Sequence, residues 1–179
     1  MRSIFTVHAG EYLVADYIER RYGKTHGVRV WVPSKDDGID LLVTSKGYER
    51  VVTLQVKFSK SYINVGDYDS SGWWVINRNK LRNSKADYWV FVMPELNGKW
   101  KFNARFFLAL PPRILLDRLV ATCGRLPKYD VYFTRKDKAV IQTRGLKKRD
   151  RISLFEKPEG NRDFSEYFDN WEKILKKVL

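Results

Sequence analysis

Cysteine and histidine are scarce in this chain of 179 residues, which contains 1 Cys and 2 His. The single Cys123 cannot form an intramolecular disulfide, and this favours a reducing compartment. Structural zinc sites need Cys and His clusters at fixed spacing, and the sequence has none. The composition therefore argues against a disulfide scaffold and against a structural zinc module.

Long apolar runs are also missing. No segment approaches the roughly 18 uninterrupted apolar residues that mark a membrane span. The N-terminal sequence MRSIFTVHAGEYLV has no sustained signal core. We therefore expect a soluble, cytoplasmic protein with no membrane partner.

Acidic residues are too few to balance the basic ones. The sequence has 34 Lys and Arg against 21 Asp and Glu, which gives a formal net charge of +13 and a pI near 9.8. The basic residues are spread along the chain and interleaved with 6 Trp, 10 Tyr and 10 Phe. A distributed positive field favours a polyanion, so we expect nucleic acid as the partner, ahead of an acidic membrane or a role of the charge in solubility alone.

The most informative stretch is residues 33–57, PSKDDGIDLLVTSKGYERVVTLQVK, which reads as two strands joined by a turn. The first strand opens with Asp40, and the second ends with Gln55 and Lys57. Because strand side chains alternate, Gln55 and Lys57 share one face, while Val52, Leu54, Val56 and Phe58 form an apolar face on the other side.

Three acids compete for a role before the first strand. Asp36 and Asp37 lie in a polar loop where they could cap a turn, whereas Asp40 lies between Ile39 and Leu41. Its apolar neighbours anchor Asp40 in the sheet, so we choose it as the candidate ligand.

A strand-opening Asp beside a strand that ends in Gln-x-Lys resembles the PD-(D/E)XK nuclease superfamily, with Gln55 in place of the second acid. The resemblance covers about the first third of the chain, and a few members of the superfamily, including a homing endonuclease type, use Gln-x-Lys. It implies an α/β (α+β) fold with a restriction-endonuclease-like core, a central mixed β-sheet flanked by helices. Within one domain, residues 1–179, the catalytic core would be about 1–110 and a helix and hairpin extension about 111–179.

A helix over residues 9–22 adds Glu11, because many members place a glutamate on a helix before the hairpin. Val14, Ile18 and Tyr22 share one face of this helix with Glu11, and Gly23 supplies a stop. Alternatively, Glu11 lies in the first turn, where a carboxylate interacts favourably with the positive end of the helix dipole and can stay in solvent. Beside Asp40 and Lys57, an inward carboxylate is better explained by a metal site or a hydrogen-bonded site.

The resemblance implies that Mg²⁺, with Mn²⁺ as an alternative, is held by Glu11, Asp40 and the backbone carbonyl of Val56. Gln55 would offer an amide oxygen or orient a water, and Lys57 would stabilise charge in the transition state. Glu11, Asp40, Gln55 and Lys57 are thus the candidate catalytic residues.

Basic and hydroxyl side chains in three segments are candidates for contacting DNA phosphates. The segment after the second strand is equally compatible with a flexible connector, and residues 144–151 with a solvated linker. The candidates are Lys60, Ser61, Tyr62, Arg78, Lys80, Arg82, Lys147, Lys148, Arg149 and Arg151.

The remaining elements complete the α/β pattern. We expect a central strand at residues 88–93, another over residues 100–110, a helix opened by Pro111 and Pro112, and a hairpin over residues 129–143. Trp73 and Trp74 read as core residues. Asp163, with Glu166 three residues on, predicts a capped C-terminal helix. Its apolar stripe, which should dock on the domain or on a partner subunit, comprises Phe164, Tyr167, Phe168, Trp171, Ile174, Leu175 and Val178.

Three functions are compatible with these residues. The favoured one is a metal-dependent DNA endonuclease that hydrolyses phosphodiester bonds, of a site-specific restriction or homing type or a junction-resolving type. The others are a catalytically degenerate nucleic-acid-binding protein on the same fold and a basic scaffold in which the motif is incidental. Enzymes that cut both strands often pair two sites, so we expect a homodimer.

Overall fold

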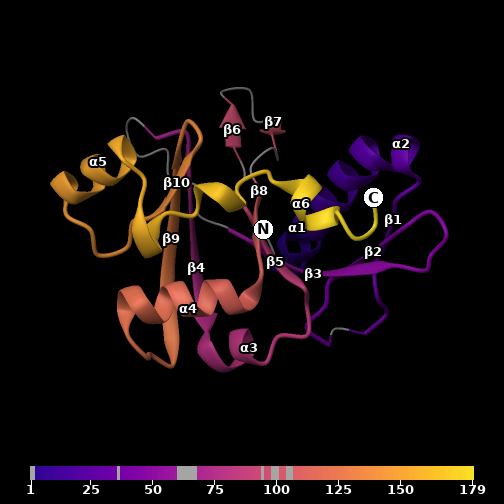
Figure 1. Ribbon diagram of the computed structural model, residues 1–179, viewed down its shortest axis with the longest axis horizontal. Helices are drawn as coiled ribbons and strands as arrows, with labels where there is room; N and C mark the ends of the chain where they lie inside the picture. Colours follow the sequence, from indigo (N-terminus) through magenta and orange to yellow (C-terminus); the bar gives the residue numbers. More distant parts are fainter. Residues whose placement is uncertain (1–2, 36, 60–67, 94, 98–100, 104–106) are drawn as a thin grey trace.

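A five-stranded mixed sheet forms the centre of the computed structural model, which describes residues 3–35, 37–59, 68–93, 95–97, 101–103 and 107–179 (Figure 1). Its strand order is β1-β2-β3-β5-β8, with β3 parallel to β5 and the other pairs antiparallel. The strands are β1 Arg29–Trp31, β2 Leu41–Thr44, β3 Val51–Phe58, β5 Tyr88–Val92 and β8 Phe107–Leu110. The predicted central mixed sheet flanked by helices is therefore confirmed.

The first helix is longer than predicted and does not end at Gly23. Helix α1 (Ser3–Ile18) continues through the π-helical η1 (Glu19–Gly23) into α2 (Lys24–His26). Gly23 keeps right-handed helical angles, and the left-handed residue that ends the helix is Gly27, with φ of 69°. The Gly27 N–H donates to the Gly23 carbonyl at 3.1 Å. The prediction was wrong because glycine stops a helix only where the backbone turns left-handed.

Helix α1 covers one face of the central sheet. Val14 and Ile18 are fully buried against Leu54 and Val56 of β3. These β3 residues belong to the alternate set predicted to be apolar, so Gln55 and Lys57 lie on the other face. The face opposite α1 therefore carries the candidate site.

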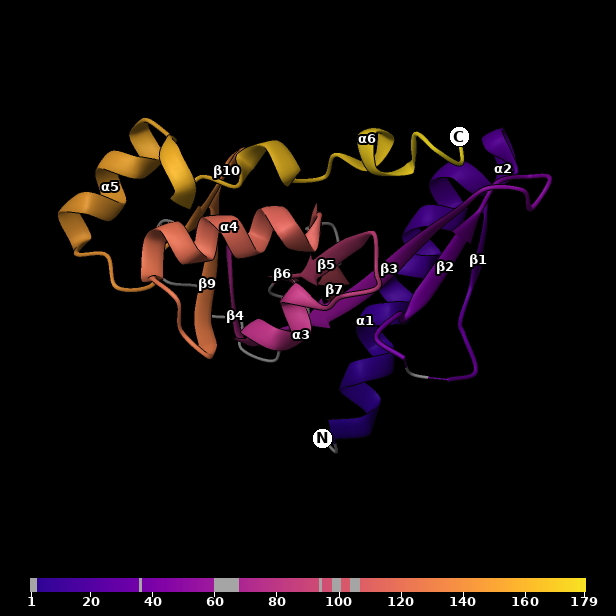
Figure 2. The same cartoon turned by 60° about the horizontal axis from the view of Figure 1, so that its bottom comes forward.

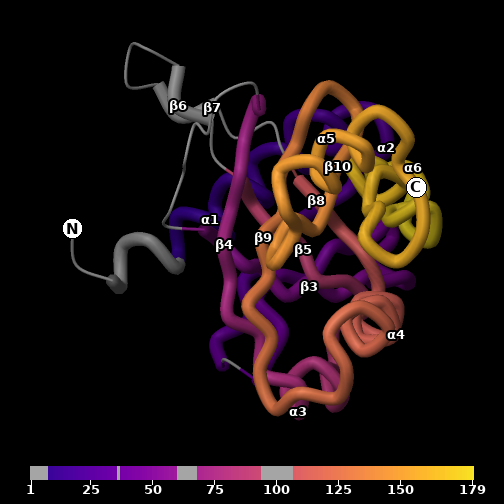
Figure 3. Tube along the Cα trace, turned by 90° about the vertical axis from the view of Figure 1, so that its left-hand side faces the viewer, coloured from indigo at the N-terminus to yellow at the C-terminus, as the bar shows by residue number. Residues whose placement is uncertain are grey.

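A second antiparallel sheet packs on that opposite face, in the order β10-β9-β4 (Figure 3). Its strands are β4 Ser70–Asn77, β9 Lys128–Lys136 and β10 Ala139–Gln142, so the hairpin predicted over residues 129–143 is confirmed. Trp74 and Phe133 of this sheet pack with Phe91 of the central sheet in a second core cluster. The two sheets thus share a buried layer rich in aromatic side chains.

Helices α3 (Arg78–Arg82) and α4 (Pro112–Cys123) lie together along one side of this second core (Figure 2). Pro112 occupies the first turn of α4, as predicted, because its missing N–H costs nothing there. The strand expected over residues 100–110 is split into β7 (Lys101–Asn103) and β8, and β7 pairs with β6 (Glu95–Asn97) in a small ribbon.

The C-terminal segment is not the single capped helix that the sequence predicted. After α5 (Lys148–Glu156) it forms three short pieces, η2 (Gly160–Arg162), η3 (Ser165–Tyr167) and α6 (Trp171–Leu175). The Phe164 N–H donates to the Val140 carbonyl at 2.8 Å, and the Asp169 N–H to the Phe107 carbonyl at 2.9 Å. The edges of β10 and β8 therefore take up backbone groups that a helix would have used internally. The burial of Phe164, Trp171 and Ile174 was nevertheless predicted correctly by the apolar stripe.

Within the part of the chain that the structure describes, no helix is both long enough and apolar enough to cross a membrane.

Candidate active site

Asp40 lies directly before β2, where β2 and β3 begin to separate. Its backbone N–H donates to the Leu54 carbonyl at 2.8 Å, which anchors the residue to β3. Its side-chain Oδ2 accepts hydrogen bonds from the Val56 N–H at 2.6 Å and from the Gln55 Nε2 at 2.5 Å. The carboxylate therefore accepts from a β3 N–H two residues beyond Leu54, where the backbone ladder with β2 ends.

The Val56 carbonyl points to the same side as Asp40. In an antiparallel pair the N–H and C=O of one residue face the same neighbouring strand. Because the Val56 N–H faces Asp40, its carbonyl also faces the gap that opens before β2. This geometry makes the carbonyl oxygen a possible metal ligand beside the Asp40 carboxylate.

Gln55 is oriented by Asp40 on one side and by the turn before β2 on the other. The Nε2 group donates to Asp40, so the amide oxygen Oε1 takes no part in this hydrogen bond. Gly38, with φ of 81°, passes close to that oxygen, and a Cβ added at Gly38 would lie 3.8 Å from Oε1. The amide thus satisfies Asp40 and still presents an oxygen.

Lys57 lies two residues further along β3, on the face of Gln55. Its Nζ lies 5.1 Å from the ring centroid of Trp89, which is the β5 residue paired with Gln55. The Lys57 carbonyl accepts a hydrogen bond from Trp74 Nε1 at 3.1 Å. Both the side chain and the backbone of this lysine are therefore held by buried tryptophans.

Glu11 is placed differently from the other candidates, because it lies on α1 and α1 covers the opposite face of the sheet. Its side chain is 12% exposed and contacts the His8 Nδ1 at 3.2 Å. The preceding Gly10 packs closely on Phe58, where an added Cβ would lie 2.8 Å from the Phe58 Cβ. Glu11 is thus near the end of β3 but on the other side from the Gln55 and Lys57 side chains.

The other acids of the loop before β2 do not join this group in the described structure. Asp37 is 74% exposed and pairs with Lys85 Nζ at 2.5 Å. Asp36 lies outside the described residues.

The oxygen donors at Asp40 suit Mg²⁺ in kind, although they include a single carboxylate. Both hydrogen bonds to Asp40 end on Oδ2, which leaves Oδ1 for an ion beside the Gln55 amide oxygen and the Val56 carbonyl. Among the described residues, no group of three or more His, Cys, Asp or Glu could hold a metal. Mg²⁺ commonly keeps several waters and takes one or two carboxylates plus phosphate oxygens, so this donor set fits such an ion.

The basic candidates form two surface groups at different ends of the second sheet. Lys80 and Arg82 are exposed on α3, where Arg78 is half-buried. At the start of α5, Lys147, Lys148 and Arg149 are exposed. Arg151, one turn into the same helix, is half-buried. Lys60, Ser61 and Tyr62 lie outside the described residues.

Trp73 and Trp74 separate onto opposite faces of β4, which the sequence interpretation missed. Trp74 is buried, whereas Trp73 is 42% exposed and stacks on Tyr132 with 6.2 Å between ring centroids. The alternation of Trp73 and Val75 with Trp74 and Ile76 is the signal that could have revealed an exposed face.

Comparison with known proteins gives little further support. No family model matches the chain, and no curated protein matches it. Among solved structures, the bacterial homing endonuclease I-Ssp6803I superposes with a TM-score of 0.47 and 13% sequence identity. The superposition covers 99% of this chain and 95% of that one. Residue roles in this protein therefore depend on its own geometry.

Proposed function

We propose that this protein is a Mg²⁺-dependent DNA endonuclease, with Mn²⁺ as an alternative ion, that hydrolyses phosphodiester bonds. The observation that carries the proposal is the convergence of Asp40, Gln55 and the Val56 backbone where β2 and β3 separate, with Lys57 on the same face. The net charge of +13 supports DNA as the substrate.

Asp40, the Val56 carbonyl and the Gln55 amide oxygen would hold the ion, which supplies a Lewis acid and lowers the pKa of coordinated water. The two N–H groups on Oδ2 fix the Asp40 carboxylate in one orientation, so Oδ1 is aimed before substrate arrives. Glu11, expected from the sequence as a direct ligand, lies on a helix at the other face of the sheet, so we propose only an indirect role for it at this ion.

Lys57 would stabilise the extra negative charge that develops on the phosphate in the transition state. In that step the oxygen of water bonds to phosphorus and the bond from phosphorus to the leaving oxygen breaks. The position of Lys57 is set in advance by the Trp89 ring and by the Trp74 hydrogen bond. Preorganised charge of this kind avoids the cost of reorienting solvent during the reaction.

Cleavage of a panel of duplex, branched and single-stranded DNA with Mg²⁺ or Mn²⁺ tests the proposal. Asp40→Asn and Lys57→Ala should each lower the rate about a hundredfold or more, with DNA binding in metal-free buffer little changed. Asp37→Asn is the matched control, because Asp37 is an exposed acid of the same loop. Equal rates for Asp40→Asn and Asp37→Asn would overturn the assignment.

A catalytically degenerate DNA-binding protein is the second candidate. It is favoured by Gln55, which replaces an acid and leaves one carboxylate at the gap between β2 and β3. If the natural chain cuts nothing while Gln55→Glu cuts DNA, this second function holds.

We also propose that two copies pair. In support, the edge of the sheet at β1 exposes Trp31 at 49% and Val32 at 66%, and the Trp31 ring contacts the exposed Tyr48. Exposed apolar side chains that gather at a strand edge favour association. Sedimentation of the natural chain and of Val32→Glu would test this, and a monomer at all concentrations would refute it.

A further inference from the structure

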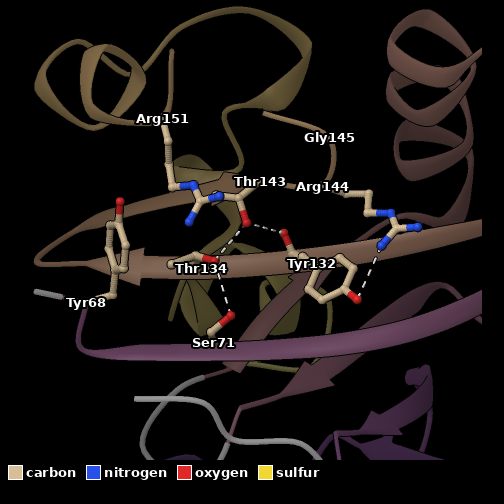
Figure 4. A pocket seen from close by; sticks show the side chains of 8 residues that line it. All are labelled: Tyr68, Ser71, Tyr132, Thr134, Thr143, Arg144, Gly145 and Arg151. Carbon is tan, nitrogen blue, oxygen red and sulfur yellow. Dashed lines mark hydrogen bonds between the residues drawn. The ribbon is translucent and has the colours of Figure 1, made fainter. Parts of the chain in front are cut away.

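A pocket of about 270 Å³ lies on the outer side of the second sheet, beneath α5 (Figure 4), and Asp40 is not among its lining residues. Ser71 of β4 and Thr134 of β9 form its floor together with Thr143, which follows β10. Arg151 reaches into it from α5. Its lining comprises Tyr68, Ser71, Tyr132, Thr134, Thr143, Arg144, Gly145 and Arg151.

The floor of the pocket is a chain of three hydroxyls. Ser71 Oγ and Thr134 Oγ1 lie 3.2 Å apart, and Thr134 Oγ1 and Thr143 Oγ1 lie 2.9 Å apart. Three hydroxyls carry three protons, and the two bonds between them use only two. One O–H donor therefore remains for a ligand or for the Tyr132 carbonyl, which lies 3.5 Å from Thr143 Oγ1.

Arg151 supplies the charge of the pocket. Its Nη2 donates to the Leu146 carbonyl at 3.4 Å, but its Nε is buried and has no hydrogen-bond partner among the described residues. Among the described residues the guanidinium makes no further hydrogen bond or ion pair, so its Nη groups can donate to an acceptor that arrives from outside.

Arg144 and Tyr132 form one wall of the pocket. The Arg144 guanidinium lies over the Tyr132 ring, 5.3 Å from its centroid, and Nη1 donates to the Tyr132 hydroxyl at 3.4 Å. Asp130 pairs with Arg144 at 3.6 Å from outside the lining. The lining residues thus offer two guanidinium groups and several hydroxyls, and none of them is acidic.

A site rich in donors and without carboxylates suits a ligand whose oxygens only accept hydrogen bonds. We infer that this pocket binds a phosphate group of a DNA strand, an inference that rests on DNA being the partner in the proposed function. The exposed Lys147, Lys148 and Arg149 continue the positive surface along the start of α5, as an extended polyanion requires.

The second sheet holds this pocket in a fixed position relative to the candidate active site. Ser59, which follows β3, accepts a hydrogen bond from the Trp73 N–H at 3.0 Å, and Trp74 bonds to the Lys57 carbonyl. A strand bound at the pocket would therefore be held by the same β4 that supports Lys57.

Arg151→Gln and Arg113→Gln provide a matched pair, because each removes one arginine charge from a helix, Arg113 is exposed on α4, and only Arg151 lines the pocket. We expect Arg151→Gln to weaken the binding of a short duplex about tenfold and to make the log–log salt slope shallower by about 1. Arg113→Gln should change the affinity about twofold or less. Ser71→Ala, which leaves the charge unchanged, should weaken binding a few-fold, and it keeps the test available if Arg151→Gln does not fold.

Inorganic phosphate separates a DNA site from a site for the free ion. At constant ionic strength, phosphate should raise the melting temperature of the natural chain and of Arg113→Gln, but not of Arg151→Gln. If the Arg151 and Arg113 variants behave alike towards DNA and towards phosphate, the proposed phosphate site is overturned. If Arg151→Gln loses the phosphate response but binds DNA as Arg113→Gln does, the DNA assignment is overturned.

Failure of the nuclease proposal would look different. If the natural chain never cuts DNA, but its DNA affinity depends on Arg151 and not on Arg113, the pocket is retained and the catalytic function is lost. If the chain cuts DNA and the two variants bind it equally well, the catalytic function is retained and the pocket is lost.

Discussion

Trp74 Nε1 donates a hydrogen bond to the Lys57 carbonyl at 3.1 Å, which joins the second sheet to the strand that carries the candidate site. The same indole packs edge-on against Phe91, with ring centroids 5.1 Å apart. Gly72 makes room for it, since a Cβ there would lie 2.2 Å from the Trp74 ring. The position of Lys57 thus depends on a layer that is distant in sequence.

Trp74→Phe should therefore affect both stability and the site. We expect the free energy of unfolding to fall by about 2 kcal/mol, because a buried hydrogen bond and part of a packed side chain are lost. Trp73→Phe, at the exposed neighbour, should cost about 0.5 kcal/mol or less. Urea denaturation measures both, and similar losses in the two variants would contradict the assigned role.

Gln55→Glu should place a second carboxylate against Asp40, where Gln55 Nε2 now lies 2.5 Å from Oδ2. Because like charges repel at this distance, the variant should melt at a lower temperature at pH 8 without metal. Mg²⁺ should then stabilise it more than it stabilises the natural chain.

Asn79→Asp on the exposed face of α3 controls for the added charge of Gln55→Glu. If Mg²⁺ raised the melting temperatures of both variants equally, the ion would not lie between residues 40 and 55.

Glu11→Gln tests whether the helix carboxylate contributes to metal binding. Since α1 lies on the face opposite the Gln55 and Lys57 side chains, Glu11 can act on an ion at Asp40 only around the end of β3. We expect the Mg²⁺ concentration for half-maximal cleavage to rise less than in Asp40→Asn.

Asp16→Asn, which removes an acid paired with Arg20 on the same helix, serves as the control for Glu11→Gln. A loss equal to that of Asp40→Asn would instead make Glu11 a direct ligand.

Tyr17 links α1 to the C-terminal segment and should make stability depend on alkaline pH. Burial and the adjacent Asp169 carboxylate, which accepts the Tyr17 hydroxyl at 3.0 Å, raise the pKa of Tyr17 to about 12 from 10.0. The folded chain holds this proton more tightly than the unfolded chain. The stabilising contribution is therefore complete below pH 10.0 and is lost as the pH rises towards about 12.

Urea denaturation between pH 8 and pH 12 measures this effect. The decline in unfolding free energy above pH 10 should be smaller in Tyr17→Phe than in the natural chain. A decline of the same size in both would contradict the link between Tyr17 and Asp169.

The hairpin and the order of Asp40, Gln55 and Lys57 along it could be predicted from the sequence. Alternation along a strand is local, and an antiparallel turn fixes which residues face each other, so β2 and β3 followed from about 25 residues. The helix opened by Pro112 and the hairpin of β9 and β10 were predictable for the same reason.

Long-range packing decided the rest. The C-terminal apolar stripe specified burial of Phe164 and Trp171, but the free edges of β10 and β8 drew its backbone out of the helix. The sequence placed Glu11 on the core side of its helix, yet only the docking of α1 decided which face of the sheet that side meets. The pocket beneath α5 brings Ser71, Thr134 and Arg151 together from three separate elements. No local pattern encodes such a meeting, because it depends on how whole sheets and helices pack.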